Sequence, residues 1–257
     1  MLKLLIKKSL LSKKFIFASC LILFMCFLAN FMHMPDDIFN KSLIEAILIP
    51  LTGYQSMLSL IAPVIVCVPF AAEYVNYNRG GFEKYAITRT GKDSWYNHIF
   101  IINMIIGFLV FVITLIIYCI ICFLFFRGKI DQSNLTNLFD GVYKGLASKS
   151  YVLFAIVNII HTGLYGVAFA SMGLALSFYF KNKFIAWIGP FILSNLLGLT
   201  MIKFNLTAYA PNIMFKTSTI GHQTFINILI SFTFITVGSY FAGKLKFKWN
   251  VKNDQEF

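Results

Sequence analysis

Long apolar runs alternate with short polar segments along the whole chain. Six of these runs are long enough to cross the hydrocarbon core of a bilayer as helices. Pro63 and Pro69 are expected to kink the second of them. The pattern predicts a single all-α transmembrane domain over residues 1–257, with spans at about residues 15–34, 55–75, 99–126, 151–180, 184–202 and 223–242.

The first segment, residues 1–14, mixes leucines with five lysines and is expected to lie along the headgroups as an interfacial basic segment. A signal peptide is the competing interpretation. We favour a retained first span, because residues 15–34 are too long for a signal core and show no small-residue cleavage pattern. At the other end, residues 243–257 are expected to form a short cytoplasmic tail.

A polar, glycine-broken island, residues 73–98, separates the second and third apolar runs. Its charged side chains cannot lie in hydrocarbon, so the island must sit at a membrane surface. Gly80 and Gly81 permit a sharp turn, and Gly91 can end the short amphipathic helix that follows. Phe82, Tyr85 and Ala86 are expected on one face of that helix. A helical hairpin loop that merely rests on the headgroups remains the alternative.

Composition and charge support a membrane protein and set its orientation. Hydrophobic residues make up 58% of the chain, charged residues only 12%, and mean hydropathy is +0.76. Because the net charge of +12 is concentrated between the apolar runs, it indicates anionic lipid headgroups and membrane orientation rather than nucleic acid. If both termini and the island are cytoplasmic, fifteen of the 22 basic residues lie inside. The positive-inside rule therefore favours that arrangement.

Candidate catalytic and metal motifs are weak. The four histidines are scattered and form no HExxH pattern, and Cys119 and Cys122 form a CxxC within an apolar run. The stretch 238–244, GSYFAGK, has the spacing of a phosphate-binding loop, but Leu245 replaces the metal-binding Ser or Thr and no strand precedes it. We expect no catalytic site, bound cofactor or metal in this chain.

Polar groups inside the spans leave two questions open. Asn158 and His161, one turn apart in the fourth span, can polarise a pore or hydrogen-bond a neighbouring helix, and we favour the second role. Glu73 lies within a turn of the inner surface. An ordinary ion pair with Arg79 or Lys84 and a specific coupling role are equally compatible with its position.

Small residues form a stripe along the fourth span, where they allow a second helix to approach closely in lipid. The sequence leaves open whether this face packs within the chain or across a dimer. The stripe consists of Gly163, Gly166, Ala170, Gly173 and Ser177.

The layout as a whole resembles the membrane (permease) subunits of type 2 ATP-binding-cassette exporters. The shared features are a basic N-terminal segment, six spans with both ends inside, and an acid and a glycine opening the loop between spans two and three. In this chain that loop holds Glu73, Gly80 with Gly81, the helix FEKYA, and Thr88 with Arg89. The fourth span ends in a similar way, ASMGLALSFYFKNKFIAW, with small residues, a tight basic turn and an immediate return.

The resemblance implies a cytoplasmic coupling helix that docks on a separate ATPase subunit, which binds the ATP and Mg. It implies contact through Phe82, Glu83, Lys84, Tyr85 and Arg89, and bracing of the second span by Glu73 and Arg79. It also implies a second membrane subunit, identical or homologous, and a location in the bacterial plasma membrane.

The function expected from this resemblance is ATP-driven export of a hydrophobic or amphipathic cargo, such as a peptide, lipid or drug. Immunity to an antimicrobial peptide is one role of that kind. The alternatives are a membrane anchor or sensor subunit that transports nothing, and an ATP-independent carrier.

Overall fold

The computed structural model describes residues 2–33, 43–52, 57–125, 142–147, 149–180, 182–211, 213, 215, 217 and 224–253, and all secondary structure within them is helical. The first half comprises α1 (Leu2–Leu10), α2 (Lys13–His33), α3 (Leu43–Leu51), α4 (Leu58–Cys67), α5 (Glu73–Arg79), α6 (Phe82–Thr90) and α7 (Lys92–Phe125). The second half comprises α9 (Lys144–Ala147), α10 (Tyr151–Tyr179), α11 (Lys183–Lys203), the 3₁₀ helix η2 (Thr207–Tyr209) and α12 (Phe225–Asn253).

Five helices are long and apolar enough to cross a membrane, as expected for a multi-pass membrane protein. They correspond to the first, third, fourth, fifth and sixth expected spans. Their candidate membrane-spanning parts are Lys13–Met32, Lys92–Phe125, Tyr151–Tyr179, Lys183–Lys203 and Phe225–Val251.

The second expected span, residues 55–75, is broken at Pro69, one of the two prolines that were expected to kink it. The apolar helix α4 has only ten residues, and turns at residues 68–72 separate it from α5. Pro69 lies in this break and has no N–H with which to continue the helical hydrogen bonds. Pro63 lies inside α4 and leaves the carbonyl of Ser59 without its helical donor; the Tyr165 hydroxyl donates to that oxygen at 3.4 Å.

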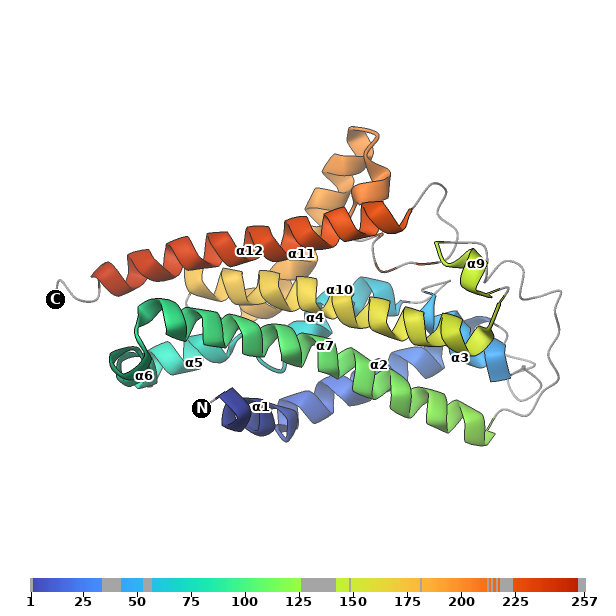
Figure 1. Cartoon of the computed structure of the whole chain (residues 1–257), viewed down its shortest axis with the longest axis horizontal. Helices are drawn as coiled ribbons and strands as arrows, with labels where there is room; N and C mark the ends of the chain where they lie inside the picture. Colours follow the sequence, from blue (N-terminus) through green and yellow to red (C-terminus); the bar gives the residue numbers. More distant parts are fainter. Residues whose placement is uncertain are drawn as a thin grey trace.

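Helix α10 is the centre of the bundle and packs against α7, α12, α11 and α4. In Figure 1 it runs between α7 and α12, while α11 leaves the bundle at a steep angle. The buried side chains of α10 extend along nearly its whole length, from Phe154 to Phe178. It therefore holds the other long helices together.

The small-residue stripe of α10 packs within the chain. Gly166 lies against Gly107 of α7 so closely that a Cβ on it would overlap the Gly107 carbonyl oxygen, and a Cβ on Gly107 would come within 2.6 Å of Ala170. Gly163 faces side chains of α7, and a Cβ on Gly173 would come within 2.6 Å of Cys67 Sγ in α4. Ser177, also fully buried, donates to the Leu174 carbonyl at 2.6 Å. These residues therefore pack within the chain, which is one of the two arrangements that the sequence left open.

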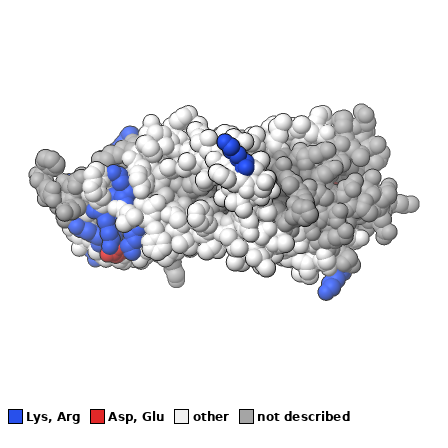
Figure 2. Space-filling view, turned by 90° about the horizontal axis from the view of Figure 1, so that it is seen from above, with Lys and Arg blue, Asp and Glu red and all other residues white. Residues whose placement is uncertain are grey.

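The start of α1 and the end of α12 lie at the same end of the molecule as α5 and α6, while α3 and α9 lie at the opposite end (Figure 1). Basic side chains gather at this first end, and the middle of the face seen in Figure 2 is almost free of them. We call it the basic end. Within the expected tail, residues 243–257, α12 continues as a helix as far as Asn253, and Phe247 and Val251 are buried against the bundle.

Candidate functional site

Two glycines set the position of α6 between α5 and α7. Gly81 precedes the helix with φ 69°, and Gly91 ends it with φ 82°, both in the region that residues with a Cβ avoid. The expected turn and helix end are therefore present. Gly80 lies in the same turn, with φ −83°. The result is a nine-residue helix that projects at the basic end, with α5 before it and α7 after it.

The inward side of α6 is fixed by aromatic and polar contacts. The ring of Phe82 lies 5.4 Å from that of Tyr77 in α5 and 5.9 Å from that of Trp95 in α7. Glu83 is buried and accepts a hydrogen bond from Asn78 Nδ2 at 2.9 Å. The structure thus places Glu83 inside the α5–α6 corner, although the family resemblance implied that it takes part in a docking contact.

The outward side of α6 carries exposed aromatic and basic side chains. Tyr85 is 75% exposed, although the sequence pattern placed it on the same face as the buried Ala86. Phe82 keeps 44% of its surface exposed despite its two ring contacts. Exposed rings beside basic groups are typical of protein-binding surfaces. We refer to this set as the α6 surface: Phe82, Lys84, Tyr85, Thr88 and Arg89.

Glu73 joins the start of α5 to the start of α2. It forms an ion pair with Lys14 and accepts a hydrogen bond from Asn76 Nδ2 at 2.9 Å. Partial burial acts to raise the pKa of Glu73, but the interactions with Lys14 and Asn76 outweigh it, so that the pKa is lowered. Arg79 is exposed in the last turn of α5. Glu73 thus braces α5 against α2.

A cluster of aromatic side chains links α5 to the long helices. Tyr74 of α5 lies 4.2 Å from Phe178 at the end of α10, measured between ring centroids. Phe178 in turn lies 5.4 Å from Tyr96 of α7 and 5.7 Å from Phe247 of α12. One cluster therefore contacts α5, α7, α10 and α12, and a displacement of α5 must displace at least one of these helices or separate the rings.

Hydrogen bonds and ion pairs reinforce the same junction. Tyr96 donates to the Tyr240 carbonyl at 2.6 Å, and Asn250 Nδ2 donates to the Phe178 carbonyl at 2.9 Å. At the surface, Asp93 lies 3.4 Å from Lys244 and 3.2 Å from Lys248. Sequence reasoning missed this junction. The residues come from distant segments, and the only local signal is aromatic residues four or seven apart in Tyr96–Phe100 and Tyr240–Phe247.

Far from the basic end, Asn158 and His161 hydrogen-bond Thr217 and Tyr143, which lie outside the helices, whereas the sequence favoured a bond to a neighbouring helix. Asn158 Oδ1 accepts from the Thr217 hydroxyl at 2.5 Å, and Asn158 Nδ2 donates to the Phe154 carbonyl at 2.8 Å. His161 Nδ1 lies 3.0 Å from the Tyr143 hydroxyl. Both side chains therefore have hydrogen-bond partners within the chain.

The glycine-rich stretch 238–244 is helical along its whole length, as part of α12. The site described above consists instead of the α6 surface and the aromatic junction beneath it. A comparison of the chain with known protein families, with curated proteins and with solved structures finds no match.

Proposed function

We propose that this protein is the membrane subunit of an ATP-driven exporter, and that the α6 surface docks on a separate cytoplasmic ATPase subunit. The proposal rests first on the sequence resemblance described above. The observation that carries it is the α6 surface itself: exposed aromatic and basic side chains on a short helix clamped between two positive-φ glycines. In this proposal α4 lies in the second of six membrane segments, and α5 begins the cytoplasmic island that carries α6.

The contacts beneath α6 give a physical route from the docking surface to the membrane helices. Phe82 contacts Tyr77 of α5 and Trp95 of α7. Tyr74 lies in the same helix α5, one turn before Asn78, and contacts Phe178 of α10. A push on α6 by a closing ATPase would therefore reach α7 and α10 through packed rings. Closely packed side chains move between discrete arrangements rather than deforming continuously.

The charges support a docking role for the outer face. Lys84 and Arg89 leave α6 basic outside, while its acid, Glu83, is turned inward. A partner groove with acidic side chains and an apolar slot for Tyr85 would complement this surface. In such interfaces a central aromatic or arginine anchor commonly contributes about 2 kcal/mol or more.

The test is affinity purification of the tagged full-length protein in mild detergent, followed by identification of the bound subunit and an ATPase assay. The native chain is compared with the double variant Tyr85→Ala, Arg89→Ala. A matched control, Trp249→Ala with Lys246→Ala, removes one exposed aromatic and one basic residue from α12 at the same end. We expect an ATP-binding-cassette ATPase with the native chain and the control, and a loss of about 30-fold or more in affinity with the α6 variant.

Two outcomes would contradict the proposal. If the native complex is well folded but contains no ATPase, the result would favour a membrane anchor, a sensor subunit or an ATP-independent carrier. Equal loss of the ATPase in the α6 variant and the α12 control would remove the docking role from α6.

A further inference from the structure

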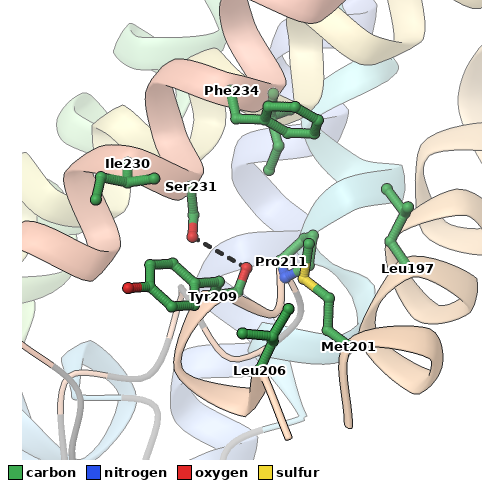
Figure 3. A pocket seen from close by; sticks show the side chains of 9 residues that line it. Leu197, Met201, Leu206, Tyr209, Pro211, Ile230, Ser231 and Phe234 are labelled. Carbon is green, nitrogen blue, oxygen red and sulfur yellow. Dashed lines mark hydrogen bonds between the residues drawn. The ribbon is translucent and has the colours of Figure 1, made fainter. Parts of the chain in front are cut away.

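A cavity of about 410 Å³ opens between the end of α11, η2 and the first turns of α12 (Figure 3). Leu197 and Met201 of α11 form one wall, and Ile230 and Phe234 of α12 form the opposite wall. Its volume lies within the range of roughly 300–1,000 Å³ that small-ligand sites occupy. The cavity is far along α11 from the α6 surface and takes no part in the proposed docking.

The chemistry of the cavity wall is that of hydrocarbon. Seven of its nine lining residues have no side-chain polar group other than the Met201 thioether. The Ser231 hydroxyl is occupied, because it donates to the Tyr209 carbonyl at 3.0 Å, an interaction drawn in Figure 3. Apart from the Tyr209 hydroxyl, the lining side chains offer a polar or charged occupant little to replace its lost hydration. The wall therefore selects an apolar chain.

The position of the cavity makes lipid the neighbouring medium. Both α11 and α12 are candidate membrane spans. At the cavity edge Phe234 is 67% exposed and Leu206 is 48% exposed, so the surrounding surface is itself apolar. An acyl chain can enter from such surroundings without crossing a polar barrier.

A basic residue ends the helix that forms one wall of the pocket, although it is not itself a lining residue. Lys203, the last residue of α11, is exposed and follows Met201 by two residues. Among the described residues between 184 and 243 it carries the one formally charged side chain. Asn205, with φ 59°, then reverses the chain so that Leu206 lines the pocket. An apolar cavity whose wall helix ends in a lysine is complementary to a hydrocarbon chain attached to an anionic headgroup.

We propose that this cavity binds one acyl chain of an anionic phospholipid, whose phosphate pairs with Lys203. The lipid would fill the space between α11 and α12 and thereby hold the far end of α11 to the bundle. This proposal stands apart from ATPase docking.

The test places the native full-length chain in lipid nanodiscs that contain phosphatidylglycerol with a photoreactive diazirine on one acyl chain. A phosphatidylcholine probe of the same structure provides the uncharged comparison, and labelled residues are mapped by mass spectrometry. We expect labelling of Met201 and Phe234 to exceed that of Leu199, which is 64% exposed on the same helix as Met201, by about tenfold with the anionic probe. Labelling of these residues at the Leu199 level, with both probes, would overturn the proposal.

Separate variants test the apolar cavity and the charge of Lys203. Ser231→Phe fills the cavity from a buried position, and its control, Thr233→Phe, adds the same ring at an exposed position of α12. Leu206→Trp narrows the cavity from its half-exposed rim. It replaces Ser231→Phe in the experiment if that variant does not fold. Loss of the preferential label in the filling variants and its retention in Thr233→Phe would support the site. Retention in a folded filling variant would contradict it.

The charge is tested by Lys203→Gln. We expect the preference for the anionic probe to fall about tenfold while labelling by the uncharged probe stays the same. An unchanged preference would remove Lys203 from the site. Loss of label together with crosslinks between two copies across α11 would assign the cavity to a dimer contact instead and overturn the lipid assignment.

Discussion

Helices α10 and α6 use their side chains in opposite ways. Along α10, buried residues run from Phe154 to Phe178 and contact four other long or apolar helices. On α6, only Glu83 and Ala86 are buried among nine residues, while five side chains face outward. The first helix contributes packing, and the second offers a surface that the chain itself leaves uncovered.

This difference separates stability from recognition. Substitutions on α10 remove or crowd contacts that every folded copy needs, whereas substitution of Tyr85 on the α6 surface changes a side chain that is 75% exposed. The effect on the free energy of unfolding should therefore decline from the α10 interface to the α6 surface. Each of the following predictions tests one step of that decline.

The largest loss of stability is expected for Gly166→Val. A side chain there would overlap the Gly107 carbonyl and Phe111, so α7 and α10 must separate. Overpacking of this kind costs about 1–3 kcal/mol, and backbone displacement adds to it. The control is Gly238→Val in α12, where an added Cβ meets open space. Thermal denaturation followed by size-exclusion chromatography should show a lower midpoint for Gly166→Val alone. Equal midpoints would mean that α7 and α10 do not pack this closely.

The positions of the long helices could be predicted because apolar runs of membrane length leave few alternatives. Two helices differ from the expected spans for local reasons. Pro69 stops α4 well short of a full span, and Phe247 with Val251 draws α12 past Ala242 through a lysine-rich stretch of low average hydropathy. Average hydropathy conceals one buried face when the opposite face is charged.

The site was predicted less completely than the fold. The turn glycines and the short helix follow from local sequence, since left-handed backbone favours glycine. The inward face of α6 does not, because Tyr77 and Trp95 decide which side packs. The Lys14–Glu73 pair and the Tyr74–Phe178 contact join residues far apart in the chain, and helical periodicity carries no information on such pairs.

A smaller loss is expected for Asn158→Leu, at the far end of α10. The substitution leaves the buried Thr217 hydroxyl without its acceptor, at a cost of about 1–3 kcal/mol. Asn195→Leu in α11 is the matched control, because Asn195 is only partly buried and donates within its own helix, to the Phe191 carbonyl. Denaturation by a graded detergent mixture should separate the two variants. If the control loses as much stability, the Asn158–Thr217 bond is not the cause.

The Lys14–Glu73 pair should contribute less, about 1 kcal/mol or below, since both side chains remain partly exposed. Because the folded state lowers the pKa of Glu73 from its ordinary value of 4.5, the contribution is present above that pH and is lost as pH falls through the folded pKa. The stability difference between the native chain and Glu73→Gln should therefore shrink in acid. Denaturation at pH 7 and below pH 4.5 measures this. A difference that grows in acid would contradict the sign.

The smallest effect on stability is expected for Tyr85→Ser on the α6 surface. Tyr85 is 75% exposed, and surface substitutions away from buried contacts usually change stability by no more than about 0.5 kcal/mol. Phe82→Ala, three residues earlier, removes ring contacts to Tyr77 and Trp95 and should cost more, about 0.5–1.5 kcal/mol beyond the lost apolar area. Thermal midpoints of the two purified variants give the comparison. If Tyr85→Ser destabilises the isolated chain as much as Phe82→Ala, Tyr85 packs within the protein and is not available to a partner. A native midpoint combined with a lost partner would show that α6 keeps this ring exposed for recognition.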